Sequence, residues 1–470
     1  MQRCIENELQ HNFKQMKLKS TQRTFIPVKQ RVKHLLMLKD LIQMHTKALS
    51  NAVSADFSYR SPHETYLMEL FPVVNSLKFC IRHVKAWAKD RKRQVSWLFK
   101  PARAWISPQP LGVVGIIVPW NYPLLLALEP LAYALAAGNR VMLKMSELTP
   151  MTGLLLAKII QGSVLGEQVK IINGDASSAK YFSDLPFDHL FFTGSTRVGK
   201  EILRATANNL TPVTLELGGK SPAVISSTVD LHHLPRLFMG KFANAGQTCV
   251  APDYLCIPEG FENRLIESLD DFVNKHYPQF PSDDAYSAII SQPHYDRLQG
   301  LLQDAIEKGA RVVKILAKKG SATTLRKMPL YLLFNVQQTM RVMQEEIFGP
   351  LLPVLSFNRF QEVKEIILAN PDPLVIYYFG SSKEEKDLLR LSVRSGALSI
   401  NDTLTHVAID DLPFGGIGRS GIGAYHGREG FDRFSSLKPI FLQSNFSLNT
   451  WFYPQVSAGM RQLLKYLIGR

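Results

Sequence analysis

The sequence predicts an α/β protein in which a parallel sheet is covered by helices on both faces. Residues 111–118 form an almost continuous apolar run, which suits a strand buried on both sides. Several such runs alternate with segments of helical spacing along the chain. At 470 residues the chain is too long for one ordinary core. We therefore expect a doubly wound sheet followed by a second α/β region.

The elements follow in order from hydrophobic spacing and from turn residues. Residues 30–100 show helical spacing, and 104–110 form a proline-bounded connecting strand. Helix 124–137 ends at Gly138, and a later helix begins with Thr149 as N-cap and Pro150 at its first position. Strands are expected at 111–118, 140–144, 170–173, 189–193 and 212–217, and the second α/β region spans about 219–423.

The formal charge of +15 requires that acidic partners be considered. The densest basic stretch, 82–103, is interpreted as a solvated helix face followed by a basic loop. No aromatic-rich recognition module accompanies it, so no nucleic acid partner is expected. The basic amphipathic tail, 460–470, is expected to dock onto protein rather than onto a membrane.

Segment 111–139 is apolar, but it contains three prolines and Glu129, which fit poorly in a lipid-exposed helix. No transmembrane segment is expected. The N-terminus is too polar for a signal peptide. The four cysteines have no repeated spacing, so a disulfide framework is not indicated. A reducing, cytoplasmic location is expected.

Residues 191–199 contain a glycine turn between an apolar strand and a helix. Such a turn presents backbone N–H groups and the positive end of the helix dipole to a phosphate. The spacing differs from the usual G-x-G-x-x-G pattern. A plain strand-to-helix connection explains it equally well.

Three further residues are candidates for chemistry. Cys249 follows small, polar residues that suit a loop beside a cleft, although a lone cysteine is more often a buried apolar residue. Glu216 lies near a strand end before two glycines, and it is either a general base or a residue capping the loop. Asn121 follows a core strand, where its amide either stabilises an oxyanion or caps a turn.

Seven motifs stand in order along the chain: Pro119-Trp-Asn-Tyr-Pro123, Lys144-Met-Ser-Glu147, Phe192-Thr-Gly-Ser195, Leu215-Glu-Leu-Gly-Gly-Lys220, Asn244-Ala-Gly-Gln-Thr-Cys249, Glu345-Glu-Ile-Phe-Gly-Pro350 and Pro413-Phe-Gly-Gly416. Together they resemble the motifs of the aldehyde dehydrogenase superfamily, in order and spacing, from about residue 30 to 440. Within it, Glu346-Ile-Phe-Gly-Pro-Leu-Leu-Pro353 and Gly421-Ile-Gly-Ala-Tyr-His-Gly427 resemble the class 3 branch, and Leu185-Pro-Phe-Asp-His-Leu190, Asn401-Asp-Thr-Leu404 and Asp411-Leu-Pro-Phe-Gly-Gly416 resemble bacterial coniferyl aldehyde dehydrogenases.

The resemblance implies oxidation of an aldehyde to the carboxylic acid. It assigns Cys249 as the nucleophile that forms a thiohemiacetal and then a thioester, with Asn121 and the Cys249 N–H stabilising the oxyanion. It assigns Glu216 as the base that activates the hydrolytic water. The substrate implied is aromatic and similar to coniferyl aldehyde, with medium- and long-chain aliphatic aldehydes left open.

The resemblance also implies a nicotinamide cofactor, with NAD favoured over NADP. The family usually has proline where this chain has Met145, which loosens the turn after Lys144. The residues assigned to cofactor binding are Trp120, Lys144, Glu147, Gly194, Ser195, Val198, Gly199, Glu346 and Phe348.

Domain boundaries and a homodimer are implied in the same way. Residues 1–99 and 111–218 form the dinucleotide-binding domain, and 219–423 form the catalytic domain. Residues 100–110 and 424–470 form the bridging segments for oligomerisation.

Cys80 and Cys256 carry no motif and are expected to be structural. His426 is expected to be a loop residue rather than a base. Tyr122 either lines a substrate tunnel or packs in the core.

Two rival functions remain open. A reductase or acyl-transferring dehydrogenase of the same fold would dispense with a water-activating carboxylate at position 216. A catalytically idle binding protein would not need Cys249, Glu216, Asn121 and Lys144 together.

Overall fold

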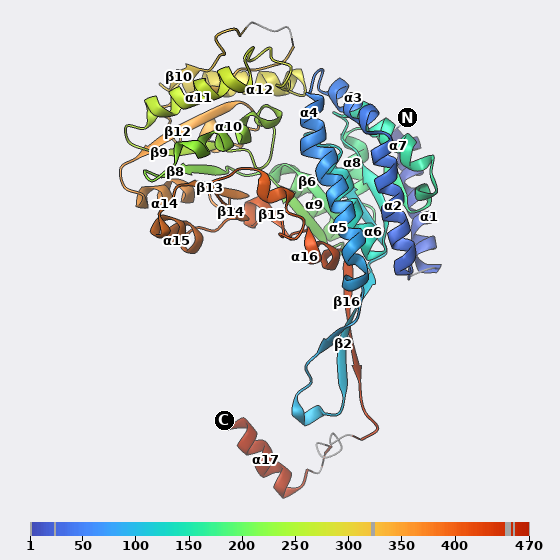
Figure 1. Cartoon of the computed structure of the whole chain (residues 1–470). Helices are drawn as coiled ribbons and strands as arrows, with labels where there is room; N and C mark the ends of the chain where they lie inside the picture. Colours follow the sequence, from blue (N-terminus) through green and yellow to red (C-terminus); the bar gives the residue numbers. More distant parts are fainter. Residues whose placement is uncertain (1, 23–24, 321–324, 447–452, 455, 470) are drawn as a thin grey trace.

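The computed structural model describes residues 2–22, 25–320, 325–446, 453–454 and 456–469. This part of the chain contains two large sheets with their helices, and a three-stranded arm that projects from them (Figure 1). Both large sheets are mainly parallel. The predicted α/β fold class is confirmed.

The first large sheet has six strands in the order β15-β7-β6-β3-β4-β5. All its neighbours are parallel except β15, which is antiparallel to β7. Each strand predicted for this sheet is present, with both ends within two residues of the expected position. The strands are β3 (Val113–Ile117), β4 (Arg140–Lys144), β5 (Val169–Ile172), β6 (His189–Gly194), β7 (Val213–Leu217) and β15 (Gly421–Ile422).

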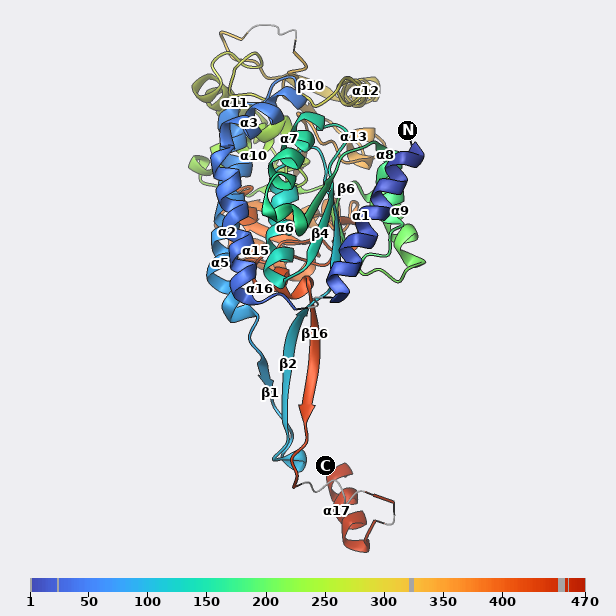
Figure 2. The same cartoon turned by 90° about the vertical axis from the view of Figure 1, so that its right-hand side faces the viewer.

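Side chains alternate between the two faces of this sheet, as strand geometry requires. Val114 and Ile116 pack with α5 and α6, while Val113 and Ile117 pack with α1, α8 and α9. Figure 2 shows α1 and α9 on one side and α6 on the other. The helices of this half are α1 (Gln2–Gln22), α2 (Val28–Met44), α3 (Thr46–Asp56), α5 (Phe71–Trp87), α6 (Leu125–Ala137), α7 (Pro150–Gln161), α8 (Ala176–Ser183) and α9 (Thr196–Ala207).

The helical expectation for residues 30–100 is correct only as far as Trp87. Beyond it lie the short strand β1 (Arg91–Arg93) and the 3-10 turn η2 (Trp97–Phe99). The basic stretch therefore leaves the helix and joins the arm, because β1 pairs with β2. A second irregularity lies between α3 and α5, where α4 (Pro62–Thr65) continues into a π-helical turn, η1 (Tyr66–Leu70).

The second large sheet has seven strands in the order β10-β11-β12-β9-β8-β13-β14, with β10 antiparallel to β11. Its strands are β8 (Pro222–Ile225), β9 (Tyr254–Pro258), β10 (Arg311–Lys314), β11 (Tyr331–Phe334), β12 (Leu351–Phe357), β13 (Val375–Phe379) and β14 (Ala397–Ile400). Its helices are α10 (Leu234–Phe242), α11 (Glu262–His276), α12 (Gln292–Glu307), α13 (Arg341–Gln344), α14 (Gln361–Leu368) and α15 (Lys383–Ser392).

The arm consists of β1, β2 (Arg103–Pro110) and β16 (Ser435–Leu442), all antiparallel. The connecting strand predicted at 104–110 is thus confirmed. The short helix α16 (Gly427–Arg433) precedes β16, and α17 (Ala458–Ile468) lies beyond the far end of the arm (Figures 1 and 2).

Every helix in the described part of the chain is too short or too polar to cross a lipid bilayer. Segment 111–139, considered above as a span, forms β3, a turn and the buried helix α6. Gly138 ends that helix in the left-handed conformation, with φ 96°.

The start of α7 differs from the prediction in one contact. Thr149 occupies the cap position and Pro150 begins the helix, but the Thr149 side chain makes no capping hydrogen bond. Instead the Asp56 carboxylate accepts from Met151 N and Thr152 N, both at 2.9 Å. A residue at the end of α3 therefore caps α7.

Candidate active site

Cys249 ends a tight loop that follows α10. Three consecutive residues of this loop, Asn244, Ala245 and Gly246, have positive φ values of 49°, 53° and 75°. Non-glycine residues adopt this conformation at a cost, so the surrounding contacts must hold it. A Cβ at Gly246 would approach the carbonyl oxygen of Gly349 to 2.5 Å, which explains the glycine.

The side chain of Gln247 supplies part of that support. Its amide nitrogen donates to the carbonyl oxygens of Asn244 at 2.9 Å and Ala288 at 3.1 Å. Its amide oxygen accepts from Ile290 N at 3.0 Å. Gln247 is fully buried, and it joins the cysteine loop to the segment before α12.

Asn121 lies against the same loop, from the turn after β3. Its Nδ2 donates to the carbonyl oxygen of Gln247 at 3.2 Å, and its own carbonyl oxygen accepts from Asn244 Nδ2 at 2.9 Å. The structure thus brings together two predicted site residues, Asn121 and the loop of Cys249, that come from the two halves of the protein.

Tyr122, left open between tunnel and core, is buried, and its hydroxyl lies 2.9 Å from Thr248 Oγ1. It therefore packs in the core and also touches the residue before Cys249.

The Cys249 thiol is held in its protonated form by its surroundings. Burial, followed by the negative charges of Glu346 and Glu216, raises the pKa of Cys249 to about 12. A base is therefore needed to generate the thiolate, which is the reactive form.

Glu216 is only 4% exposed, on β7. Burial raises the pKa of Glu216 well above its ordinary value, and the positive charge of Arg433 partly opposes this. Among the described residues, neither carboxylate oxygen has a hydrogen-bond partner. A carboxyl group with a raised pKa and no competing donors suits proton transfer.

Glu346 approaches the glycine pair that follows Glu216. Its Oε1 accepts a hydrogen bond from Gly219 N at 3.3 Å, and a Cβ added at Gly218 would collide with the carboxylate. Burial raises the pKa of Glu346 to about 8. Glu346 thus belongs to the same neighbourhood as Glu216 and Cys249.

A cleft of about 820 Å³ lies beside the first sheet, over the start of α9. Ser195 caps α9 by accepting from Val198 N at 3.4 Å, and the N-terminus of this helix lies at the wall of the cleft. The predicted cofactor-binding residues that line the cleft are Trp120, Glu147, Gly194, Ser195 and Val198.

The other predicted cofactor residues lie outside this lining. Phe348 is nevertheless adjacent, because its ring centroid is 5.3 Å from that of Trp120. Gly199 faces the sheet, where a Cβ would collide with Leu217, so this glycine allows close packing of α9 on β7. The Lys144 ammonium is buried and donates to the carbonyl oxygens of Met145 and Gly174, at 2.7 and 2.8 Å.

Sequence reasoning missed four residues at this site. His294 lines the cleft with its ring 4.9 Å from that of Trp120. Arg60, Glu64 and Glu69 form a buried charged group against Asn121 and Asn244. The sequence offered one signal for Arg60, Glu64 and Glu69: three charged residues stand close together in a helical segment whose neighbours face the core.

The remaining candidates are buried. Cys80 and Cys256 are free thiols in the core, as expected for structural cysteines. His426 lies in the loop before α16, as expected, but it is fully buried, with Nε2 3.1 Å from Glu129 Oε2.

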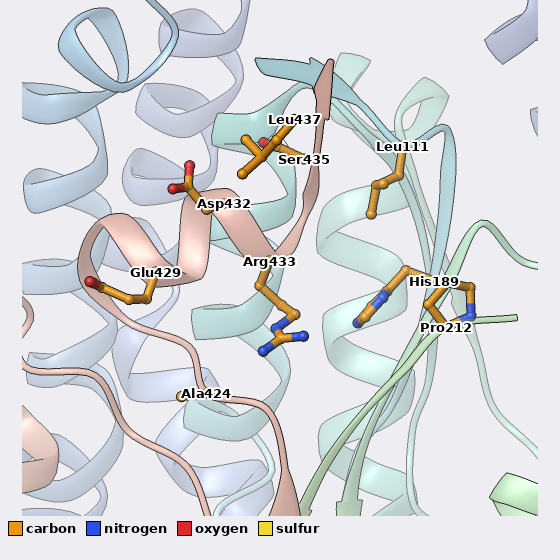
Figure 3. Close-up of a pocket in the computed structure, with 9 residues that line it drawn as sticks. All are labelled: Leu111, His189, Pro212, Ala424, Glu429, Asp432, Arg433, Ser435 and Leu437. Atoms are coloured by element: carbon orange, nitrogen blue, oxygen red, sulfur yellow. The ribbon is translucent and has the colours of Figure 1, made fainter. Parts of the chain in front are cut away.

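A second cavity, of about 500 Å³, lies at the base of the arm. Figure 3 shows Arg433 of α16 and His189 of β6 reaching it from opposite sides. The positive charge of Arg433 also acts on Glu216, where it partly opposes the rise in pKa that burial causes.

The chain is similar to known proteins both in sequence and in architecture. Residues 1–440 match the model of the aldehyde dehydrogenase family. A probable coniferyl aldehyde dehydrogenase of Pseudomonas aeruginosa is 46% identical over 442 residues, covering 94% of this chain and 92% of that protein. A coniferyl aldehyde dehydrogenase of another Pseudomonas strain is 44% identical and covers 85% of this chain and 83% of that protein.

Solved structures of aldehyde dehydrogenases have the same architecture as this chain. Staphylococcus aureus AldH, in a substrate-bound state, superposes with a TM-score of 0.91 at 33% identity, covering 97% of this chain and 99% of that one. An aldehyde dehydrogenase of Mycobacterium tuberculosis complexed with NAD+ gives a TM-score of 0.82 at 26% identity, covering 94% and 92%.

The family match, the relatives and the NAD+-bound neighbour of the same fold define an NAD(P)-dependent oxidoreductase. The chain belongs to the aldehyde dehydrogenase family. The prediction of an enzyme that oxidises an aldehyde with NAD or NADP is therefore confirmed.

Proposed function

We propose that Cys249, Asn121 and Glu216 are the catalytic residues and that the substrate is an aromatic aldehyde similar to coniferyl aldehyde. The observation that supports the catalytic set most directly is the locked contact between the Asn121 turn and the Cys249 loop, with Glu216 buried nearby. The substrate proposal is supported by the names of relatives that are 40–46% identical over most of their length.

The chemistry begins when the Cys249 thiol transfers its proton to Glu216 and its sulfur bonds to the aldehyde carbon. The aldehyde oxygen becomes an alkoxide, which Asn121 Nδ2 and the Cys249 N–H stabilise by hydrogen bonding. When bound, the nicotinamide cofactor supplies the acceptor for the hydride that leaves this carbon. The product on Cys249 is a thioester.

Glu216 then acts a second time. After it has lost the first proton, it accepts a proton from a water molecule, whose oxygen attacks the thioester carbon. The C–S bond breaks and the carboxylic acid is released. Glu216 returns its proton to the Cys249 sulfur, and overall the substrate gains one oxygen atom from water while one proton is released alongside the neutral acid.

The cleft beside α9 fits a dinucleotide, because a helix N-terminus lies at its wall. We propose that Gly194, Ser195 and Val198 meet the pyrophosphate side of the cofactor and that Glu147 meets the adenosine ribose. Glu346 and Phe348 are proposed for the nicotinamide ribose. Lys144 and Gly199 are proposed to support this cleft from behind, given their internal contacts.

The substrate proposal is tested with a panel of cinnamyl-type, benzyl-type, medium-chain and short-chain aldehydes, each assayed with NAD and then with NADP. The expected result is the highest kcat/KM for cinnamyl-type aldehydes with NAD. A strong preference for short aliphatic aldehydes would overturn the substrate while leaving the catalytic residues in place.

The catalytic residues are tested by Cys249→Ser and by mass spectrometry of the quenched enzyme. We expect turnover to be abolished in the variant and an acyl adduct to be found on Cys249 in the parent enzyme. Coenzyme A and phosphate are added in separate arms. Acceleration by either would favour an acyl-transferring enzyme over the hydrolytic one that Glu216 supports.

We also propose a homodimer that forms through the arm and segment 424–470. The arm carries exposed aromatic side chains, including Trp97 at 63% and Phe441 at 57%, which are unusual for a surface facing only water. Sedimentation equilibrium of the parent chain and of Phe441→Lys tests this, with a shift toward monomer expected for the variant.

The proposed division into 1–99 with 111–218 and then 219–423 is supported by the separate sheets of the two halves, except at its end, where β15 (Gly421–Ile422) pairs with β7 of the first sheet. A cytoplasmic location is supported by the free thiols of Cys80, Cys249 and Cys256.

A further inference from the structure

Arg60, Glu64 and Glu69 are buried charged residues; Arg60 lies just before α4, Glu64 lies in α4 and Glu69 lies in the π-turn η1. They are 0%, 7% and 0% exposed, respectively. Charged side chains are rarely buried in this way unless each has partners, because the loss of hydration is costly. Their contacts therefore indicate what the group holds in place.

Arg60 contacts the turn that carries Asn121. Its Nη1 donates to the carbonyl oxygen of Asn121 at 2.9 Å, and its guanidinium lies over the Tyr122 ring, 4.6 Å from the centroid. The same nitrogen lies 3.1 Å from Glu69 Oε1. The cation thus fixes two consecutive residues at the carboxyl end of β3.

Glu64 contacts the loop that carries Cys249. Its Oε1 accepts a hydrogen bond from the backbone N–H of Asn244, and its Oε2 accepts from Ser287 Oγ at 2.5 Å. Asn244 is the first of the three residues with positive φ. Glu64 therefore stabilises the strained start of the cysteine loop.

Glu69 contacts the beginning of α6. Its Oε2 accepts from Leu124 N at 2.7 Å and from Leu125 N at 3.1 Å. A carboxylate at this position is favoured by the otherwise unpaired N–H groups and by the helix dipole. Glu69 thereby anchors the other end of the turn that contains Asn121.

The π-turn affects where Glu69 points relative to Glu64. Glu64 lies in α4 and Glu69 in η1, whose i to i+5 hydrogen bonds widen the turn between them and bring residues five apart closer to the same side. In a regular α-helix, residues five apart point in different directions. Arg60, four residues before Glu64, lies between the two carboxylates.

We propose that Arg60, Glu64 and Glu69 act as a brace that positions the Asn121 amide relative to the Cys249 backbone N–H. These are positioning residues, since none of them carries out the chemistry. The inference rests on the roles proposed above for Asn121 and Cys249. Its physical basis is that two oxyanion donors from different halves of the protein stabilise one oxygen only when their separation is held constant.

If the three residues only stabilised the fold, their replacement would affect stability and kcat differently from the loss of a brace. Replacing a buried ion group with apolar side chains is often neutral for stability, whereas removal of one partner is costly. Stability alone therefore cannot identify the brace. The distinguishing measurement is whether kcat falls further than it does when an equally buried arginine is removed elsewhere.

Arg31 provides that matched control. It is 1% exposed, and it donates to the carbonyl oxygens of Ile26 and Ala137, both at 2.8 Å. Ala137 lies at the C-terminal end of α6, the opposite end from Leu124 and Leu125. Arg31→Met therefore removes a buried arginine of α2 that binds the backbone at the far end of α6, without touching the Asn121 turn.

The experiment compares Arg60→Met with Arg31→Met in the full-length enzyme. We expect kcat to fall by about tenfold or more in Arg60→Met, with the dissociation constant for NAD changed by less than about threefold. We expect kcat to change by less than about twofold in Arg31→Met, whatever its loss of thermal stability. Equal kcat values in the two variants would overturn the brace.

A double-mutant cycle with Asn121→Ala tests the route of the effect. If Arg60 acts through Asn121, then Arg60→Met lowers kcat much less in the Asn121→Ala background than in the parent. Additive losses would overturn the proposal. If Asn121→Ala alone leaves kcat unchanged, the proposed role of Asn121 fails, which is distinct from a failure of the brace alone.

Two further measurements keep the test decisive if Arg60→Met does not fold. Glu64→Gln and Glu69→Gln keep the shape of the side chains, and we expect each to lower kcat by about fivefold or more. The rate of Cys249 alkylation by iodoacetamide should stay within about threefold, because that reaction uses no oxyanion donor. Unchanged kcat in both glutamine variants would contradict the proposal.

Discussion

The Tyr122 hydroxyl lies 2.9 Å from the Thr248 hydroxyl, although the two residues are 126 positions apart in the sequence. Both are buried. This hydrogen bond joins the turn after β3 to the loop of Cys249, and it runs beside the contact between Asn121 and Gln247. The two halves of the protein therefore meet at the site through hydrogen bonds as well as through apolar packing.

Removing that hydrogen bond should have a measurable cost. Tyr122→Phe leaves the ring in place and deletes the hydroxyl, so we expect the free energy of unfolding to fall by about 1 kcal/mol. Urea denaturation of the holoenzyme measures this. Thr248→Val is the reciprocal control, and the double variant should lose less than the sum of the two. Additive losses would contradict a direct bond.

Glu216→Gln should slow both halves of the reaction. The glutamine can accept a proton neither from Cys249 nor from water, so we expect steady-state turnover to fall by about 10²–10⁴-fold, with formation of the acyl adduct on Cys249 slowed as well as its hydrolysis. Rapid quenching followed by mass spectrometry of the Cys249 peptide detects the adduct. Multiple turnovers at the parent rate would rule out Glu216 as the hydrolytic base.

The pH dependence of hydrolysis follows from the same residue. Because burial raises the pKa of Glu216, the ionised, basic form increases as pH rises through that value. Hydrolysis of the acyl adduct should therefore accelerate with pH in the parent enzyme and become nearly independent of pH in Glu216→Gln. Single-turnover decay of the adduct across a pH series measures both profiles.

Glu346 should make the folded protein less stable at alkaline pH. Burial raises the pKa of Glu346 to about 8 from its ordinary value of 4.5, so the folded state binds the proton more tightly than the unfolded state. The stabilisation is complete below about 4.5, and it is lost as pH rises through about 8. The Glu346→Gln variant does not lose stability in this way as pH rises.

The measurement is the difference in Tm between Glu346→Gln and the parent, taken without cofactor at pH 5 and at pH 9. We expect the variant to be close to the parent at pH 5 and to be the more stable of the two at pH 9. A difference that does not change with pH would show that Glu346 has no raised pKa in the folded state.

Asp56 should be more important for α7 than the residue at the cap position. Its carboxylate accepts from Met151 N, Thr152 N and Thr152 Oγ1, the last at 2.7 Å. Asp56→Ala should therefore lower the free energy of unfolding by about 1–2 kcal/mol, the usual cost of losing a cap. Chemical denaturation measures it.

Thr149→Val is the matched comparison, because Thr149 makes no capping hydrogen bond. We expect it to cost less than Asp56→Ala. A larger loss for Thr149→Val would mean that Thr149 is the main support of this helix.

Local patterns in the sequence predicted the strands of the first sheet closely. Strand 140–144 was predicted with the bounds of β4 (Arg140–Lys144), because a short apolar run next to glycine leaves few alternatives. The helical expectation failed after Trp87, where the chain enters the arm. A strand such as β1 (Arg91–Arg93), which has three basic residues and is held by its pairing with β2 and by an ion pair of Arg91 with Asp432, has no apolar periodicity to reveal it.

The sequence by itself determined the fold class, the order of the elements and the chemical groups of the site, because these depend on residue types and on spacing within single segments. The tertiary structure alone decided which distant groups meet. It assigned the capping of α7 to Asp56, directed the Lys144 ammonium to backbone carbonyls, and buried Arg60 against Asn121. The physical reason is that hydrogen bonds between segments depend on how the layers pack, and packing is a property of the whole chain rather than of any one segment.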